Sequence, residues 1–138
     1  MELLRRPLAA ILRCAPLLWM LFAAWLAILF FFSGSPPPKD MPTLIPYQDK
    51  FLHCVFFAGG ACALAGALSR SCGMRGFRLL AAAVLSLALA GALDEYNQQF
   101  VPGRMGLDPL DWLADLCGAI LGVLAFVRLK KFASARGA

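Results

Sequence analysis

The chain places an acidic side chain deep within an apolar stretch. Asp115 follows Asp111 by four residues, in a run from Leu110 to Val127 that has no other charged residue and ends at Arg128. At about 1.5 Å per helical residue, Asp115 lies roughly 20 Å from Arg128, inside a hydrocarbon core of about 30 Å. A carboxylate at that depth is costly unless it is paired, protonated or bound to a cation. The two acids therefore mark a candidate site for acid–base or cation chemistry.

Polar side chains recur at a matching depth in two other apolar stretches. His53, Asp94 and Asp111 each lie 16 or 17 residues from the arginine that closes the same stretch. That separation corresponds to about 25 Å of helix, so three helices would bring these groups to one level. We therefore expect a shared polar site near one membrane surface.

The last apolar stretch carries its acids and its small residues on one face. Asp111, Asp115, Gly118 and Gly122 follow one another at steps of four, three and four residues, which puts them in one helical stripe. Gly118 and Gly122 form a G-x-x-x-G motif, which permits the close approach of a second helix. The carboxylates are thus expected to face the interior of a bundle.

The residue types at this level suit proton transfer and ligand binding. An imidazole and carboxylates are typical general acids and bases, so the candidate catalytic residues are His53, Glu95 and Asp94. Lys50 and Arg104 carry charges that suit a phosphate. The remaining candidate ligand-binding residues are Asp49, Gln98, Asp111 and Asp115.

Acidic side chains outnumber basic ones in this region. Six carboxylates face only Lys50 and Arg104, which leaves a formal charge of −4 with His53 neutral. Such an excess cannot stay fully ionised near lipid without protons or a cation. Carboxylate oxygens suit a divalent cation. The sequence thus leaves the cofactor unknown, with a divalent cation as one candidate.

Several of these residues also have a purely structural interpretation. Asp108 before Pro109 is typical of an N-cap followed by proline at the first helical position, and Asp111 would then favour the helix dipole. Asp49 and Lys50 could anchor a helix at the membrane surface. The sequence has no nucleophile elbow, H-E-x-x-H motif or Walker loop, which favours binding over catalysis.

The composition assigns the chain to the integral membrane proteins. Hydrophobic residues make up 61% and charged residues 15%, which is too apolar for a soluble core with a wettable surface. Four stretches can span a membrane, at about residues 15–33, 51–69, 77–97 and 110–128. We predict an all-α fold, a four-transmembrane-helix bundle that forms a single membrane domain over residues 1–138. The aromatic residues of the first span, Trp25 and Phe31 among them, are expected to face lipid.

The basic residues predict the orientation of this bundle. Ten of the 13 Lys and Arg residues precede the first span, join the second to the third, or follow the fourth. By the positive-inside rule, both termini are cytoplasmic and the polar site faces the outer side. The same segregation accounts for the formal net charge of +5, so no nucleic-acid partner is expected.

The combined pattern resembles the VanZ-like family of small integral membrane proteins. The resemblance covers about residues 45–125, and its motifs are Asp49-Lys50-x-x-His53, Asp94-Glu95-x-x-Gln98-x-Phe100-x-Pro102-Gly103-Arg104, and Asp111-x-x-x-Asp115 followed by Gly118. The family usually has asparagine at the position of Asp115. A carboxylate that replaces an amide can titrate or bind metal, so this position can alter any shared chemistry.

The resemblance implies a multi-pass protein of the bacterial cytoplasmic (inner) membrane that is linked to the cell envelope. Its expected partners are membrane lipid and a lipid-linked cell-wall precursor, and a role in glycopeptide (teicoplanin) susceptibility is one consequence to test. The expected function is a polar outer-leaflet pocket that binds a lipid-linked or phosphate-bearing ligand. The alternative is an intramembrane hydrolase or transferase that acts on a lipid-linked envelope precursor or a phospholipid head group.

Overall fold

The described part of the chain is all-helical. The computed structural model describes residues 2–37 and 45–134, and these residues form five helices and no strand. The helices are α1 (Glu2–Arg13), α2 (Ala15–Ser33), α3 (Gln48–Ser71), α4 (Gly76–Gln98) and α5 (Pro109–Ser134). Helices α2 to α5 are long and apolar enough to cross a membrane. The predicted all-α fold with four spans is confirmed, and three of the spans run a few residues beyond their predicted bounds.

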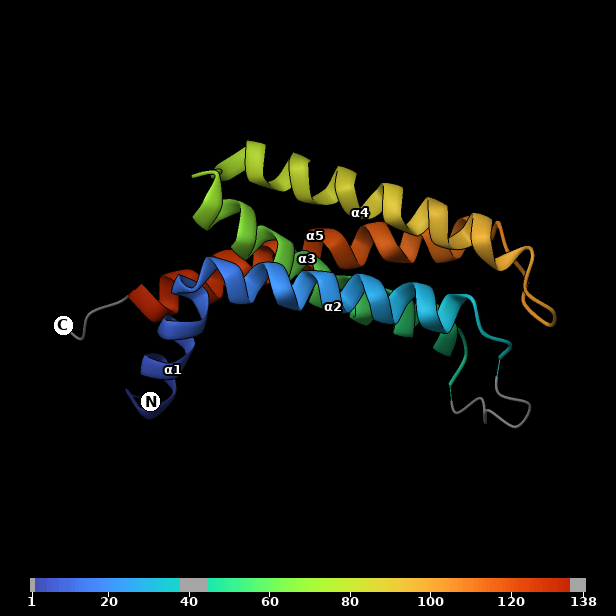
Figure 1. The fold of residues 1–138 in the computed structure, drawn as a ribbon, viewed down its shortest axis with the longest axis horizontal. Helices are drawn as coiled ribbons and strands as arrows, with labels where there is room; N and C mark the ends of the chain where they lie inside the picture. The colour runs from blue at the N-terminus through green and yellow to red at the C-terminus, as the bar shows by residue number, and fades with distance from the viewer. Residues whose placement is uncertain (1, 38–44, 135–138) are drawn as a thin grey trace.

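The four long helices lie lengthwise beside one another, and consecutive helices run in opposite directions (Figure 1). The start of α1, the end of α5 and the α3–α4 connection lie at one end, which we call the basic end. The end of α2, the start of α3 and the α4–α5 connection lie at the other, which we call the polar end. Helices α3 and α5 form the most extensive contact. The start of α3, the end of α4 and the start of α5 therefore meet at the polar end.

Close packing of α3 against α5 depends on the two glycines of the G-x-x-x-G motif. A Cβ atom at Gly118 would collide with the backbone oxygen of Cys54. A Cβ atom at Gly122 would collide with the backbone oxygen of Ala58 and would lie 2.7 Å from the Cβ of Ala61. The expected close approach is confirmed, and it brings the acids of α5 against α3.

One aromatic residue of α2 differs from expectation. Phe31 is 70% exposed, in agreement with lipid contact, whereas Trp25 is buried. The Trp25 ring occupies the space above Gly60, and its Nε1 donates a hydrogen bond to the backbone oxygen of Phe56 at 2.9 Å. The expectation that Trp25 faces lipid is wrong because a glycine on α3 leaves room for its ring.

Helix α1 is an element that the sequence interpretation missed. It contacts α5 and α2 at the basic end, and it points away from the long axis of the bundle (Figure 1). The break comes at Cys14, which has extended backbone angles, and Pro16 follows as an early residue of α2. Proline lacks an N–H group and cannot continue the hydrogen-bond ladder of a preceding helix, so it favours a new helix at this point.

Candidate functional site

Two helix starts position the acidic residues at the polar end. Helix α3 begins after Tyr47, which has a left-handed φ of 57°. Lys50 and His53, in the first two turns of α3, contact Asp111 and Asp115 of α5. Helix α5 begins with an N-cap, because the Leu110 N–H donates a hydrogen bond to Asp108 Oδ1 at 2.8 Å. The capping role expected for Asp108 is confirmed.

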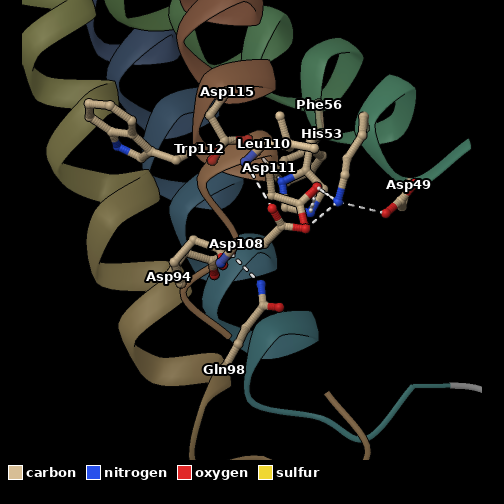
Figure 2. A network of polar contacts seen from close by, with 12 residues as sticks. Asp49, His53, Phe56, Asp94, Gln98, Asp108, Leu110, Asp111, Trp112 and Asp115 are labelled. Atoms are coloured by element: carbon tan, nitrogen blue, oxygen red, sulfur yellow. Dashed lines mark hydrogen bonds and ion pairs between the residues drawn. The ribbon is translucent and has the colours of Figure 1, made fainter. Parts of the chain in front are cut away.

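Seven ionisable residues gather there and form what we call the polar cluster (Figure 2). Three belong to α3, one to α4, one to the α4–α5 connection and two to α5. They are Asp49, Lys50, His53, Glu95, Asp108, Asp111 and Asp115. His53 and Asp111, which the sequence places at one depth, thus meet here, whereas Asp94 of the same depth lies outside the polar cluster.

Lys50 holds three carboxylates from three different segments. Its Nζ lies 2.9 Å from Asp49 Oδ2, 2.6 Å from Asp108 Oδ2 and 2.9 Å from Asp111 Oδ1. The hydrogen bond from Lys50 lowers the pKa of Asp108 below its ordinary value. The ammonium expected to bind phosphate is therefore engaged in joining the starts of α3 and α5.

His53 and Asp115 form a direct pair across α3 and α5. His53 Nδ1 lies 2.9 Å from Asp115 Oδ1, and Asp115 has an exposed fraction of 0%. The other oxygen of Asp115 points at Gly91 of α4, where a Cβ atom would lie only 2.6 Å from it. Gly91 therefore leaves room for the carboxylate, and the sequence interpretation missed this contribution.

Glu95 is fixed between α4 and the start of α5. Its Oε2 accepts a hydrogen bond from the Asp108 N–H at 2.8 Å, and its backbone oxygen accepts one from the Leu107 N–H at 3.3 Å. The side chain has an exposed fraction of only 3%. Glu95 thus joins α4 to the connection that leads into α5.

His53, Glu95 and Asp111 come close enough to share one ligand. Each offers one nitrogen or oxygen atom, and these three atoms all lie within 4.8 Å of one another. His53 Nε2 lies 3.9 Å from Asp111 Oδ1, which is too long for a hydrogen bond. The candidate base and acid of the sequence interpretation, His53 and Glu95, are thus brought together.

Asp94 and Gln98 form a pair within α4 that is separate from His53, Glu95 and Asp111. Gln98 Nε2 donates a hydrogen bond to Asp94 Oδ2 at 2.7 Å, and both residues are buried (Figure 2). Asp94 is not part of the three-residue group formed by His53, Glu95 and Asp111. Because Asp94 is buried and bound to Gln98, its position favours a structural role over contact with a ligand.

Arg104 joins the α4–α5 connection to the end of α2. Its Nε donates a hydrogen bond to the backbone oxygen of Ser35 at 2.9 Å, and its Nη2 donates one to that of Phe32 at 2.7 Å. Basic side chains commonly bind the free carbonyl groups at a helix C-terminus. Arg104 thus binds backbone carbonyls of α2 and the residues that follow it. The phosphate expected as its partner stays a prediction.

Two buried carboxylate oxygens of the polar cluster, Glu95 Oε1 and Asp115 Oδ2, have no hydrogen-bond donor among the described residues. Asp111 Oδ1 is also buried without a hydrogen bond, but it lies 2.9 Å from the Lys50 ammonium. A buried acceptor left without a donor costs about 1–3 kcal/mol. A proton or a cation would remove that cost. The cluster is open on one side, where Lys50 and His53 keep about a fifth of their side-chain surface exposed.

Comparison of the chain with family models, curated proteins and solved structures gave no match. The chemistry of the polar cluster is therefore interpreted from its own residues. The polar cluster contains buried carboxylates, and one of them orients a histidine. It lies at one end of a bundle of membrane-length helices and is partly exposed on one side.

Proposed function

We propose that this chain is a VanZ-like protein of the bacterial cytoplasmic membrane whose polar cluster binds the phosphate-bearing head group of a lipid-linked envelope ligand. The observation that carries the proposal is a half-open polar cluster formed by three helices of membrane length. Its open side lies at the end of the bundle, at the depth of lipid head groups. A ligand could therefore enter with its head group in the cluster and its chains in lipid.

The proposed orientation has both termini in the cytoplasm and the polar cluster on the outer side. The basic residues concentrate at the opposite end, as the positive-inside rule requires. The test uses chains with a single cysteine, either the native Cys72 or a cysteine that replaces the exposed Met105. A membrane-impermeant maleimide should label Met105→Cys in intact cells and should label Cys72 only after the cells are opened. The reverse pattern would refute the orientation.

A phosphate that enters the cluster must bring positive charge with it. Lys50 is surrounded by three carboxylates, and Arg104 binds backbone carbonyls. The carboxylate excess would repel a bare phosphate. The proposed ligand is therefore a phosphate group together with a cation or a proton, and His53 is the residue that it would meet first.

Lipid binding can be measured with a fluorescent short-chain polyprenyl phosphate and the protein in lipid nanodiscs. We expect His53→Gln to weaken binding at least tenfold, because it removes the exposed imidazole of the cluster. Lys131→Gln is the matched control, since Lys131 is an exposed residue near the basic end. Equal binding by the wild type and His53→Gln would refute the proposed site.

A second candidate function is an intramembrane hydrolase or transferase, favoured by the His53–Asp115 pair. A buried carboxylate that holds Nδ1 leaves Nε2 directed at a substrate, as a general base requires. Incubation with a polyprenyl diphosphate would reveal this activity as released phosphate that is lost in His53→Gln. Binding of this lipid without release of phosphate would exclude the catalytic function and would retain the binding function.

A further inference from the structure

We infer that His53, Glu95 and Asp111 form a divalent metal site at the open side of the polar cluster. The inference deepens the proposed function, because the metal would supply the positive charge that a phosphate needs there. It rests on the proposed function only for the identity of the group that the metal would face. The site itself is argued from the geometry of these three side chains.

The distances between the three ligand atoms fit a shared ion. They lie within 4.8 Å of one another, and His53 Nε2 is 3.9 Å from Asp111 Oδ1. Ligands that bind one ion at about 2.0–2.3 Å lie roughly 3–4.5 Å apart. Small rotations of the side chains would therefore bring all three onto one ion.

The orientation of His53 is that of a metal ligand. When Asp115 is ionised, it accepts the Nδ1 proton across 2.9 Å, which leaves the lone pair of Nε2 free. That lone pair faces Asp111 Oδ1, a second electron-rich atom. Histidine ligands commonly donate their other ring nitrogen to a carboxylate, which fixes the ring and strengthens metal binding. Asp115 would be this supporting carboxylate.

Glu95 provides an independent indication of a bound cation. Its Oε2 is held by the Asp108 N–H, whereas its buried Oε1 has no donor among the described residues. The side chain is 97% buried, so water does not readily satisfy this atom. A metal ion among the three ligand atoms would provide the missing partner.

The Lys50 ammonium competes for one of the ligands, since it lies 2.9 Å from Asp111 Oδ1. It also binds Asp49 and Asp108, so it can keep two carboxylates when a metal takes the third. The cluster carries five carboxylates against one ammonium, and a divalent ion therefore reduces its charge without overcompensating it.

The ligand set favours Zn²⁺ or Mn²⁺ over Mg²⁺. Imidazole suits zinc and other transition metals, whereas Mg²⁺ prefers oxygen ligands alone and keeps several waters. Three protein ligands also leave coordination positions open. A phosphate oxygen of the ligand could fill one of them, with the ion as the bridge between an acidic cluster and an anionic head group.

Metal binding can be measured by calorimetry on the full chain, purified with a histidine-free tag and stripped with a chelator. Wild-type protein should bind one Zn²⁺ or Mn²⁺ per chain and bind Mg²⁺ at least tenfold more weakly. Glu95→Gln and His53→Gln should each weaken binding at least tenfold. Lys131→Gln is the control, because Lys131 is exposed near the basic end and lies outside the three ligands.

Folding is monitored by helical circular dichroism and gel filtration in detergent. If the variants do not fold, Co²⁺ added to the wild type tests the same site, since bound nitrogen and oxygen ligands shift its visible absorption. No shift and no stoichiometric binding by folded wild type would overturn the inference, as would equal losses in Glu95→Gln and Lys131→Gln. Polyprenyl phosphate binding that survives chelation would overturn the role of the metal in lipid binding, whereas metal binding without lipid binding would refute only the proposed function.

Discussion

The two ends of the bundle both concentrate charge, but they hold it differently. At the polar end, Glu95 and Asp115 are buried and are held by contacts from other helices. At the basic end, Arg13, Arg70 and Lys130 line a small cavity between α1, α3 and α5. Lys130 donates a hydrogen bond to Ser69 there, and Arg70 is exposed.

The difference distinguishes exposed charge, which water and lipid head groups can satisfy, from buried charge, which needs specific protein partners. Exposed cations are satisfied by water and lipid phosphate, and each contributes little to stability. Buried carboxylates require specific partners, and without them their desolvation is costly. Substitutions at the polar end should therefore change stability and binding, whereas matched substitutions at the basic end should change neither.

The largest expected effect comes from the contact that holds the polar end together. Gly118→Val would place a branched side chain against the backbone of α3 at Cys54 and force α3 and α5 apart. Overpacking of this kind costs about 1–3 kcal/mol and occasionally more. We expect the variant to lose its cooperative thermal transition in detergent. Gly59→Val is the control, since a Cβ atom there meets nothing within 4 Å; equal loss in both variants would contradict this packing account.

An intermediate effect is expected from Lys50→Met, which leaves three carboxylates facing one another without their ammonium. Because these groups are partly exposed, the loss of folding stability should be smaller than that of a broken, fully buried pair and smaller than that of Gly118→Val. Added Mn²⁺ should restore part of the thermal stability, since the ammonium no longer competes for Asp111. Lys131→Met at the basic end should melt like the wild type. If Lys50→Met were as stable as the wild type and Mn²⁺ did not change its thermal stability, the proposed difference between the two ends would be contradicted.

The smallest effect is expected from Asp115→Asn. An amide oxygen can still accept the Nδ1 proton of His53, and the side chain keeps the shape that fits beside Gly91. We expect a change in stability below about 1 kcal/mol and metal affinity within a few-fold of wild type. Asp115→Leu removes the acceptor and should lower metal affinity about 10–100-fold. A complete loss in Asp115→Asn, with the fold intact, would mean that the charge itself is required.

The sequence predicted the spans and the convergence of the polar residues for a physical reason. The rise per helical residue gives the depth of each side chain along its span. Residues three or four positions apart lie on the same face of a helix. His53, Asp111 and Asp115 could be placed in this way. The G-x-x-x-G motif further indicated which face of the last span packs closely.

Partner choice could not be predicted in the same way. Spacing along a helix gives no information on which side chain of another helix lies opposite. The three acids around Lys50, the carbonyl partners of Arg104 and the space that Gly91 leaves for Asp115 therefore appeared only in the structure. Helix α1 was missed because its basic residues were interpreted only as a signal of orientation.

The central claim is that the polar cluster holds a divalent ion together with a phosphate-bearing lipid. Native mass spectrometry of the protein released from bacterial membranes measures both at once. Wild-type protein should carry an added mass that corresponds to one ion and one phosphate-bearing lipid. His53→Gln should lose that mass, and Lys131→Gln should keep it. The same adduct on wild type and His53→Gln, or none on any of the three, would contradict the claim.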